Sequence, residues 1–369
     1  MILDLQYNDI NDIEILKNVD LKNLKEINLN ENNISDINVL ETVKFPKLEI
    51  LTLNNNNISD INILAKVNFN DLKELNVCRN KISDISVLEL ADFKNLEILD
   101  LSSNEITNIN ILEKVKFKEL KKLILGNNNI SDIKILKKVK FEKLETLDLS
   151  FNEITDIKIL EKVKFEKLLE LILNDNIISD ISYLESVNFK HLKNIELDNN
   201  EITNMDVLEK VNFKELTCLN LEFNQISNID ILEKVKFEKL EDLSLGYNGI
   251  SNINILEKLN CKELKSLDLN GNEISDINVL EKVKFKKLEY ISLQGNKISD
   301  INILDKVNLK ELKELDLSEN IISEIKVFEK MNLENLKELN FSSNKINLES
   351  YMITINHLKT KIHNCNLLY

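Results

Sequence analysis

A leucine recurs every 24 residues along this chain, from Leu24 and Leu48 to Leu336. An asparagine keeps the same period from Asn8 to Asn344, and no insertion or deletion shifts either series. Fifteen units therefore share one register. A fixed period of this length is typical of solenoids, in which each unit buries its apolar side chains only against its neighbours. The period predicts one elongated repeat domain.

The unit that begins at Leu24 shows what the first half of a repeat encodes. Ile27 and Leu29 alternate with polar residues, which is the period-two pattern of a strand that is buried on one face. Every unit enters the stack in the same way, so we expect the strands to be parallel. Asn32 follows in the turn, where a buried amide can bond the backbone of its own turn and of the next repeat. We therefore expect a ladder of asparagines.

The second half of the same unit has the spacing of a short helix. Ile37, Leu40 and Val43 recur every three residues after Ser35-Asp36, and this pattern predicts one or two helical turns with Ser35 as the N-cap. A large apolar residue then closes the unit, and we interpret this column as a core spine. It contains Phe45, Phe69, Phe93, Phe117, Phe141, Phe165, Phe189, Phe213, Phe237 and Phe285, with Leu21, Cys261, Leu309 and Leu333 in other units.

These motifs resemble a known family. The pattern LxxLxLxxNxI of residues 24–34 and 264–274 is that of the leucine-rich repeats. The continuation at residues 34–37, ISDI, resembles the subclass shared by internalins and the leucine-rich-repeat regulatory subunits of protein phosphatase 1, although units of 24 residues are longer than usual there. The resemblance implies an α/β leucine-rich-repeat solenoid, right-handed and curved, with a parallel β-sheet on its concave face and short helical turns on its convex face. It also implies a protein-binding scaffold.

The repeat pattern ends before the chain does. We predict a solenoid of about fifteen 24-residue units over residues 1–348 and a C-terminal capping segment over residues 349–369. In this tail the apolar residues Tyr351, Ile355, Leu358 and Ile362 have the 4-3-4 spacing of an amphipathic helix. At the other end the repeat is in phase from Leu3 onward, without a signal peptide or a polar cap. This start favours a piece of a longer protein.

Charge and cysteine content restrict the partners and the compartment. The chain has 48 Lys and Arg against 63 Asp and Glu, a net charge of −15, which argues against binding to nucleic acid or to an anionic membrane. No stretch is apolar enough for membrane insertion. Cys78 and Cys218 are several repeats apart, far beyond the roughly 7 Å between Cα atoms that a disulfide allows. We therefore expect a reducing compartment and predict a cytoplasmic protein.

The sequence offers little for catalysis or metal binding. His191 replaces a residue that is usually Lys or Glu in a connecting segment, so we interpret it as an exposed loop residue. His357, His363 and Cys365 match no common zinc signature, and the glycines form no phosphate-binding loop. We predict no catalytic residues, no metal and no cofactor.

The strand residues that point away from the core carry one sign of charge. In the unit that begins at Leu96 they are Ile98, Asp100, Ser102 and Ser103. The same four positions over fifteen units hold 17 acids and two bases, Arg79 and Lys122. A concave face of one sign focuses the electrostatic potential and attracts a partner with a basic surface, although a charged face is often only a solvated one.

Large apolar residues interrupt this acidic face. Exposed aromatic residues on a polar surface are typical anchors of protein interfaces. Glycines 246, 271 and 295 lie beside the aromatic residues and could leave a shallow floor, while Ile50, Ile98, Ile124 and Ile172 form a second, weaker cluster. The predicted partner-binding residues are Phe151, Phe223, Asp242, Tyr247, Asp268, Tyr290 and Asp316.

These observations favour a non-enzymatic scaffold that binds a protein through its acidic concave sheet, as an intracellular regulatory or adaptor protein. Two alternatives stay open. The chain could be a fragment of a cell-surface or secreted adhesin of the internalin kind, or the leucine-rich-repeat sensor arm of a larger enzyme. We expect a monomer unless the uncapped N-terminus self-associates.

Overall fold

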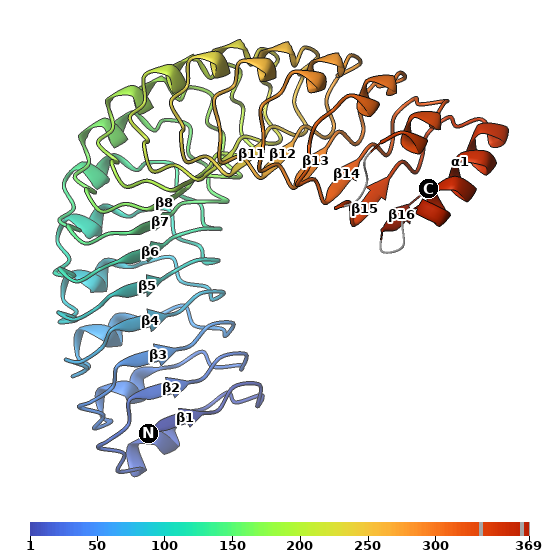
Figure 1. Ribbon diagram of the computed structural model, residues 1–369. Helices are drawn as coiled ribbons and strands as arrows, with labels where there is room; N and C mark the ends of the chain where they lie inside the picture. Colours follow the sequence, from blue (N-terminus) through green and yellow to red (C-terminus); the bar gives the residue numbers. More distant parts are fainter. Residues whose placement is uncertain (332–334, 362–364, 369) are drawn as a thin grey trace. The chain divides into compact units, whose positions relative to one another are not determined.

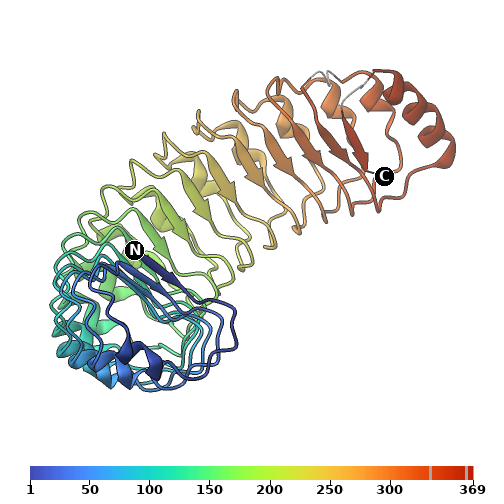
Figure 2. The same ribbon diagram turned by 90° about the horizontal axis from the view of Figure 1, so that it is seen from below.

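The structure is a computed structural model that describes residues 1–331, 335–361 and 365–368. It divides into two compact units. Unit 1 consists of Met1–Ile178 and Ser186–Leu192, and unit 2 consists of Ser179–Glu185 and Lys193–Tyr369. In each unit the strands lie on one side and short 3-10 helices on the other (Figures 1 and 2).

The strands are three residues long and parallel, as the repeat predicts. In unit 1 they are β1 (Ile2–Asp4), β2 (Glu26–Asn28), β3 (Ile50–Thr52), β4 (Glu74–Asn76), β5 (Ile98–Asp100), β6 (Lys122–Ile124), β7 (Thr146–Asp148) and β8 (Glu170–Ile172). In unit 2 they are β9 (Asn194–Glu196), β10 (Cys218–Asn220), β11 (Asp242–Ser244), β12 (Ser266–Asp268), β13 (Tyr290–Ser292), β14 (Glu314–Asp316), β15 (Glu338–Asn340) and β16 (Asn366–Leu368). Within unit 1, and within unit 2 up to β15, paired residues are one repeat apart, as Leu243 of β11 and Leu267 of β12 are.

The predicted helical turns are 3-10 helices. They are η1 (Glu14–Asn18), η2 (Asn38–Glu41), η3 (Asn62–Ala65), η4 (Ser86–Glu89), η5 (Asn110–Glu113), η6 (Lys134–Lys137), η7 (Lys158–Lys162), η8 (Ser182–Ser186), η9 (Asp206–Glu209), η10 (Asp230–Glu233), η11 (Asn254–Glu257), η12 (Asn278–Glu281), η13 (Asn302–Asp305) and η14 (Lys326–Glu329). The prediction of Ser35 as the N-cap was wrong. Asp36 Oδ1 instead accepts the backbone N–H of Asn38 at 2.8 Å, because the carboxylate reaches the donor two residues along the chain.

The core forms as predicted, with the closing phenylalanines almost fully buried. The ring centroids of Phe93 and Phe117 are 6.4 Å apart. Packing is less complete where Leu309 replaces the closing phenylalanine. A cavity of about 30 Å³ lies beside Leu309, lined also by Leu304, Leu312 and Met331. At Leu309 the smaller side chain thus leaves part of the space below the closing loop unfilled.

The asparagine ladder is present, but its direction differs from the prediction. Asn128 Nδ2 donates to its own turn, at Leu125 O (3.0 Å) and Gly126 O (3.3 Å), and also to Leu101 O (3.1 Å). Its Oδ1 accepts the N–H of Ile106 at 3.0 Å. Leu101 and Ile106 belong to the preceding repeat, not to the next one. The backbone N–H groups of the turn reach the next repeat instead, as Asn128 N does at Phe151 O.

The C-terminal tail forms a helix and a strand. The helix α1 spans Leu348–Lys361, where the apolar spacing predicts it, and buries Ile355 and Leu358 while it packs against η14. Ile362 lies outside the described residues. The strand β16 pairs with β15 and was not predicted, because it does not carry the repeat motif. The boundary between a solenoid at 1–348 and a cap at 349–369 stays a prediction, which these contacts support.

Candidate functional site

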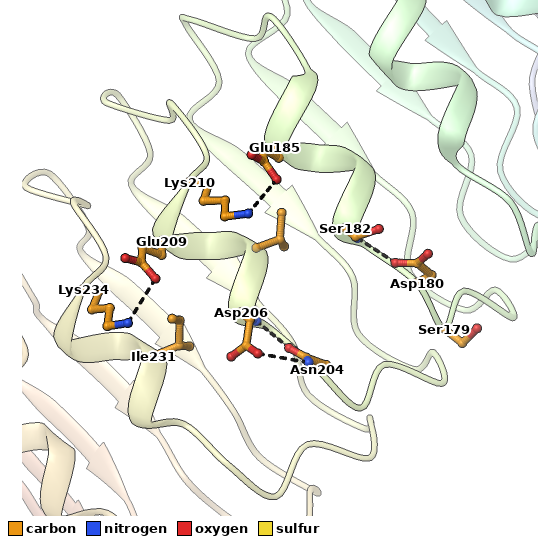
Figure 3. A pocket seen from close by; sticks show the side chains of 11 residues that line it. Ser179, Asp180, Ser182, Glu185, Asn204, Asp206, Glu209, Lys210, Ile231 and Lys234 are labelled. Carbon is orange, nitrogen blue, oxygen red and sulfur yellow. Dashed lines mark hydrogen bonds and ion pairs between the residues drawn. The ribbon is translucent and has the colours of Figure 1, made fainter.

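On the helix side of unit 2, lysines pair with glutamates of the preceding repeat. A hollow of about 530 Å³ lies along η8, η9 and η10 (Figure 3). Lys210 Nζ lies 3.1 Å from Glu185 Oε2, and Lys234 Nζ lies 3.3 Å from Glu209 Oε2. The lining also contains Asp180 and Asp206, which these two lysines do not pair, so carboxylates outnumber lysines around this hollow.

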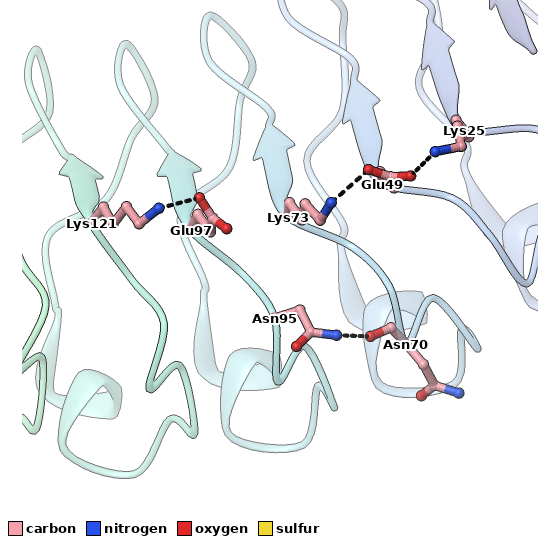
Figure 4. A network of polar contacts seen from close by, with 7 residues as sticks. All are labelled: Lys25, Glu49, Asn70, Lys73, Asn95, Glu97 and Lys121. Atoms are coloured by element: carbon pink, nitrogen blue, oxygen red, sulfur yellow. Dashed lines mark hydrogen bonds and ion pairs between the residues drawn. The ribbon is translucent and has the colours of Figure 1, made fainter.

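The residues that immediately precede the strands are paired in the same way. Glu49 accepts from both Lys25 and Lys73, with Lys73 Nζ at 2.7 Å from Glu49 Oε2, and Lys121 Nζ lies 2.7 Å from Glu97 Oε2 (Figure 4). Exposed ion pairs stabilise a fold by only about 0–1 kcal/mol each. Their main consequence here is that several lysines beside the strands already have a carboxylate partner, usually in the preceding repeat.

The side of the sheet that points away from the 3-10 helices has a different character. We call it the open sheet face and define it by the first and third residues of each strand and the two outward positions that follow. In β11 Asp242 and Ser244 lie on this face, and Leu243 between them is buried. The acids of the outward strand positions lie on this face, as predicted. Glu222, Asp242 and Asp268 form no ion pair with the described residues.

Some acids of the open sheet face also hold the backbone. Asp268 Oδ1 accepts the N–H of Asn270 at 2.9 Å. Asp316 Oδ1 accepts the N–H of Ser318 at 2.8 Å and its hydroxyl at 2.6 Å. Such turns stabilise the backbone just after the strand. Sequence reasoning missed this role, and it makes Asp242 the better residue for testing charge alone.

Two of the predicted aromatic anchors come together in unit 2. Phe223 and Tyr247 are stacked, with ring centroids 4.2 Å apart and an angle of 9° between the rings. Both are about half exposed, at 48% and 45%. Phe151 is also exposed, but it belongs to unit 1. Tyr290 is half-buried at the start of β13. We call Phe223 and Tyr247 the aromatic pair.

Backbone conformation and a missing side chain place the aromatic pair. Phe223 and Tyr247 both have φ of 48°, in the left-handed region that disfavours bulky residues. The residue one repeat further on is Gly271, with φ of 58°. A Cβ atom there would lie 2.5 Å from Tyr247 Cδ1. Gly271 therefore suits the turn and leaves room for the tyrosine ring.

Carboxylates near the aromatic pair resist ionisation. Burial raises the pKa of Glu222 to about 7, and Asp268, Asp198 and Glu196 add to the shift by repulsion. Burial also raises the pKa of Asp268 and of Asp242. A cation brought to this part of the face would relieve the repulsion.

The pKa of Glu222 leads to a prediction for stability. A carboxyl group with a pKa of about 7 in the folded protein and of 4.5 in the unfolded chain stabilises the fold fully below pH 4.5. This contribution is lost as the pH rises toward 7. Glu222→Gln removes this loss. The stability of the variant relative to the original protein should therefore rise between pH 4.5 and 7 and then level off. Urea denaturation of both proteins across this range measures the difference, and a difference that does not change with pH would contradict the assignment.

The described residues contain no group of three or more His, Cys, Asp and Glu side chains that could hold a metal ion. His191 is exposed, as expected for a loop residue, and His363 lies outside the described residues. Among the residues searched, no helix is both long and apolar enough to cross a membrane.

The isoleucines of the second predicted cluster are half-buried on the strands of unit 1, so they offer less apolar surface than the aromatic pair does.

The comparison with protein families decides the classification. A family model described as leucine-rich repeats in two copies matches residues 22–66, 94–138, 118–162, 238–282, 262–306 and 286–330. A second leucine-rich-repeat model matches residues 46–106. The first model alone covers more than half of the chain. This chain belongs to the leucine-rich-repeat family. No curated protein matches the sequence closely enough to count as a relative.

Solved structures with the same architecture extend the similarity to nearly the whole leucine-rich-repeat chain. A leucine-rich-repeat protein of Leptospira interrogans is 25% identical with a TM-score of 0.80, and the match covers 100% of this chain and 95% of that one. An internalin, internalin F of Listeria monocytogenes, is 26% identical with a TM-score of 0.65, and the match covers 92% and 85%. The fold is typical of protein-binding domains.

Proposed function

We propose that this chain is a non-enzymatic scaffold that binds a protein with a basic surface through the open sheet face of unit 2. The aromatic pair carries the proposal. Two stacked, half-exposed rings in a strained backbone conformation expose apolar surface that the fold itself does not use. Aromatic side chains of this kind dominate the binding energy of many protein interfaces.

The surrounding charge defines the partner. Burial, with repulsion from neighbouring carboxylates, raises the pKa of Glu222, Asp242 and Asp268, so the face gains from a positive charge brought to it. A lysine or arginine over an aromatic ring adds a cation–π contact of about 0.5–2 kcal/mol. A basic segment therefore satisfies both features of the site, whereas an acidic partner would increase the repulsion.

The cellular setting belongs to the same proposal at a finer level. We favour an intracellular regulatory or adaptor role, as the resemblance to phosphatase-regulatory repeats implies. The similarity to internalin F supports the alternative of a cell-surface or secreted adhesin. A third possibility, the sensor arm of a larger enzyme, requires a catalytic domain outside residues 1–369. The gene sequence on both sides of this segment, with the location of the full-length protein in cells, distinguishes these settings.

A charge reversal tests the basic-partner proposal. Asp242→Lys should slow the association of a labelled oligo-arginine peptide several-fold at low salt, and the effect should shrink as salt screens the charge. Asp230→Lys in η10 is the matched control, because it makes the same change of net charge on the helix side. Association rates measured by stopped-flow fluorescence anisotropy separate the two variants. Equal slowing by both would mean that only net charge matters, and the open sheet face would lose its role.

A further inference from the structure

The closing loop of one repeat departs from an otherwise uniform pattern. Residues 111–120 read ILEKVKFKEL and residues 255–264 read ILEKLNCKEL, so the two segments differ only at their fifth to seventh positions. The key change is at position 261, where a cysteine replaces the phenylalanine that fills the corresponding space at Phe117. Two segments that are otherwise identical therefore provide an internal comparison for the effect of this side chain.

A hollow lies at the altered loop. It measures about 710 Å³ and lies between residues 257–263 and the next closing loop at residues 284–287. Leu259 and Cys261 line its floor and are themselves almost fully buried, at 4% and 2% exposure. This size falls within the range of about 300–1,000 Å³ that is usual for small-molecule sites. The hollow resembles the cavity at Leu309 in lying where the closing phenylalanine is absent, but it opens to the surface among lysines.

The charges around this hollow have a positive excess, whereas carboxylates outnumber lysines in the hollow along η8 to η10. Five lysines line it, and two of them have carboxylate partners: Lys258 with Glu233 at 3.0 Å, and Lys287 with Glu263. The other three, Lys262, Lys284 and Lys286, form no ion pair with the described residues. The alkyl stems of lysines also extend apolar surface while the ammonium groups stay in water. The rim is thus cationic and the floor apolar.

We propose that this hollow binds a single-chain amphipathic anion, namely a fatty-acid carboxylate. The apolar tail would lie on Leu259 and Cys261, and the carboxylate would lie among Lys262, Lys284 and Lys286. Binding is non-covalent, because burial raises the pKa of the Cys261 thiol to about 12 and keeps it protonated at neutral pH. The site is separate from the open sheet face, so it stands or falls independently of the proposed protein partner.

Cys261→Phe is the decisive variant, because it restores the side chain that the fold already accommodates elsewhere. Isothermal titration of the full chain with dodecanoate, below its critical micelle concentration, should show one saturable site. Cys261→Phe should weaken that binding by at least about tenfold, which corresponds to about 1.4 kcal/mol, while it keeps or raises the denaturation midpoint. Dodecyltrimethylammonium, with the same tail and the opposite charge, should not bind at this site.

A second variant keeps the test decisive if Cys261→Phe folds poorly. Lys284→Glu combined with Lys286→Glu leaves the floor intact and should also weaken dodecanoate binding, in a salt-dependent manner. Lys114→Glu combined with Lys116→Glu, at the closing loop that contains Phe117, should not weaken it. The proposal is overturned if dodecanoate does not bind, if both detergents bind equally, or if folded Cys261→Phe binds as the original protein does.

Discussion

Asn128→Ala is expected to lower the free energy of unfolding by about 1–3 kcal/mol. The buried amide donates to three backbone carbonyls and accepts one backbone N–H, and two of these four groups belong to the preceding repeat. Alanine removes all four bonds. The N–H of the buried Ile106 then loses its acceptor, whereas Leu101 O, Leu125 O and Gly126 O keep bonds from Asn104 Nδ2, Asn152 Nδ2 and Ser103 N, respectively. Because each repeat is held mainly by its neighbours, the loss weakens the connection between two layers of the stack.

The adjacent residue provides the control. Asn129→Ala removes an exposed amide of the same type, whose only side-chain bond in the described structure is a long one of 3.4 Å to Glu153, and retains the backbone bond to Ile106. Urea denaturation followed by circular dichroism should show a lower midpoint for Asn128→Ala and almost none of this change for Asn129→Ala. Equal midpoints would show that the asparagine column does not contribute as a buried network.

Tyr247→Asn is expected to weaken binding of an oligo-arginine peptide by about 30-fold, or about 2 kcal/mol. The substitution removes the ring that stacks on Phe223 and so exposes the face of Phe223 that Tyr247 covers. Asparagine suits the experiment better than alanine, because Asn55, Asn127 and Asn199 hold the same left-handed turn position in other repeats. The backbone is therefore expected to keep its conformation.

Equilibrium anisotropy titration measures this effect, and two further variants locate it. Phe223→Asn should reproduce most of the loss, because the rings act as a pair. Lys116→Ala, in a closing loop of unit 1, should leave the affinity unchanged. If Tyr247→Asn keeps the affinity of the original protein while Lys116→Ala loses it, the binding surface lies on the loops and not on the open sheet face.

Much of the fold follows from short-range pattern, and the errors arise where several residues compete for one role. The alternation around Ile27 predicted the buried face of β2, because side chains of a strand point alternately to opposite sides. The N-cap was assigned to Ser35 although Asp36 accepts the bond, since both are good capping residues and only the geometry of the turn chooses between them. The strand β16 was missed because pairing with β15 stabilises a segment without a strand motif of its own.

The sequence by itself determined the period, the parallel strands, the buried leucines and phenylalanines, and the acidic outward positions, because each depends on residues within one repeat or on their recurrence. The tertiary structure decided the side-chain interactions between repeats. It alone shows that Phe223 and Tyr247 stack, that Gly271 makes room for the second ring, and that repulsion helps to raise the pKa of Glu222. It also shows the hollow beside the closing loop that contains Cys261. Contacts and fields between layers depend on side-chain direction and burial, which a linear pattern does not encode.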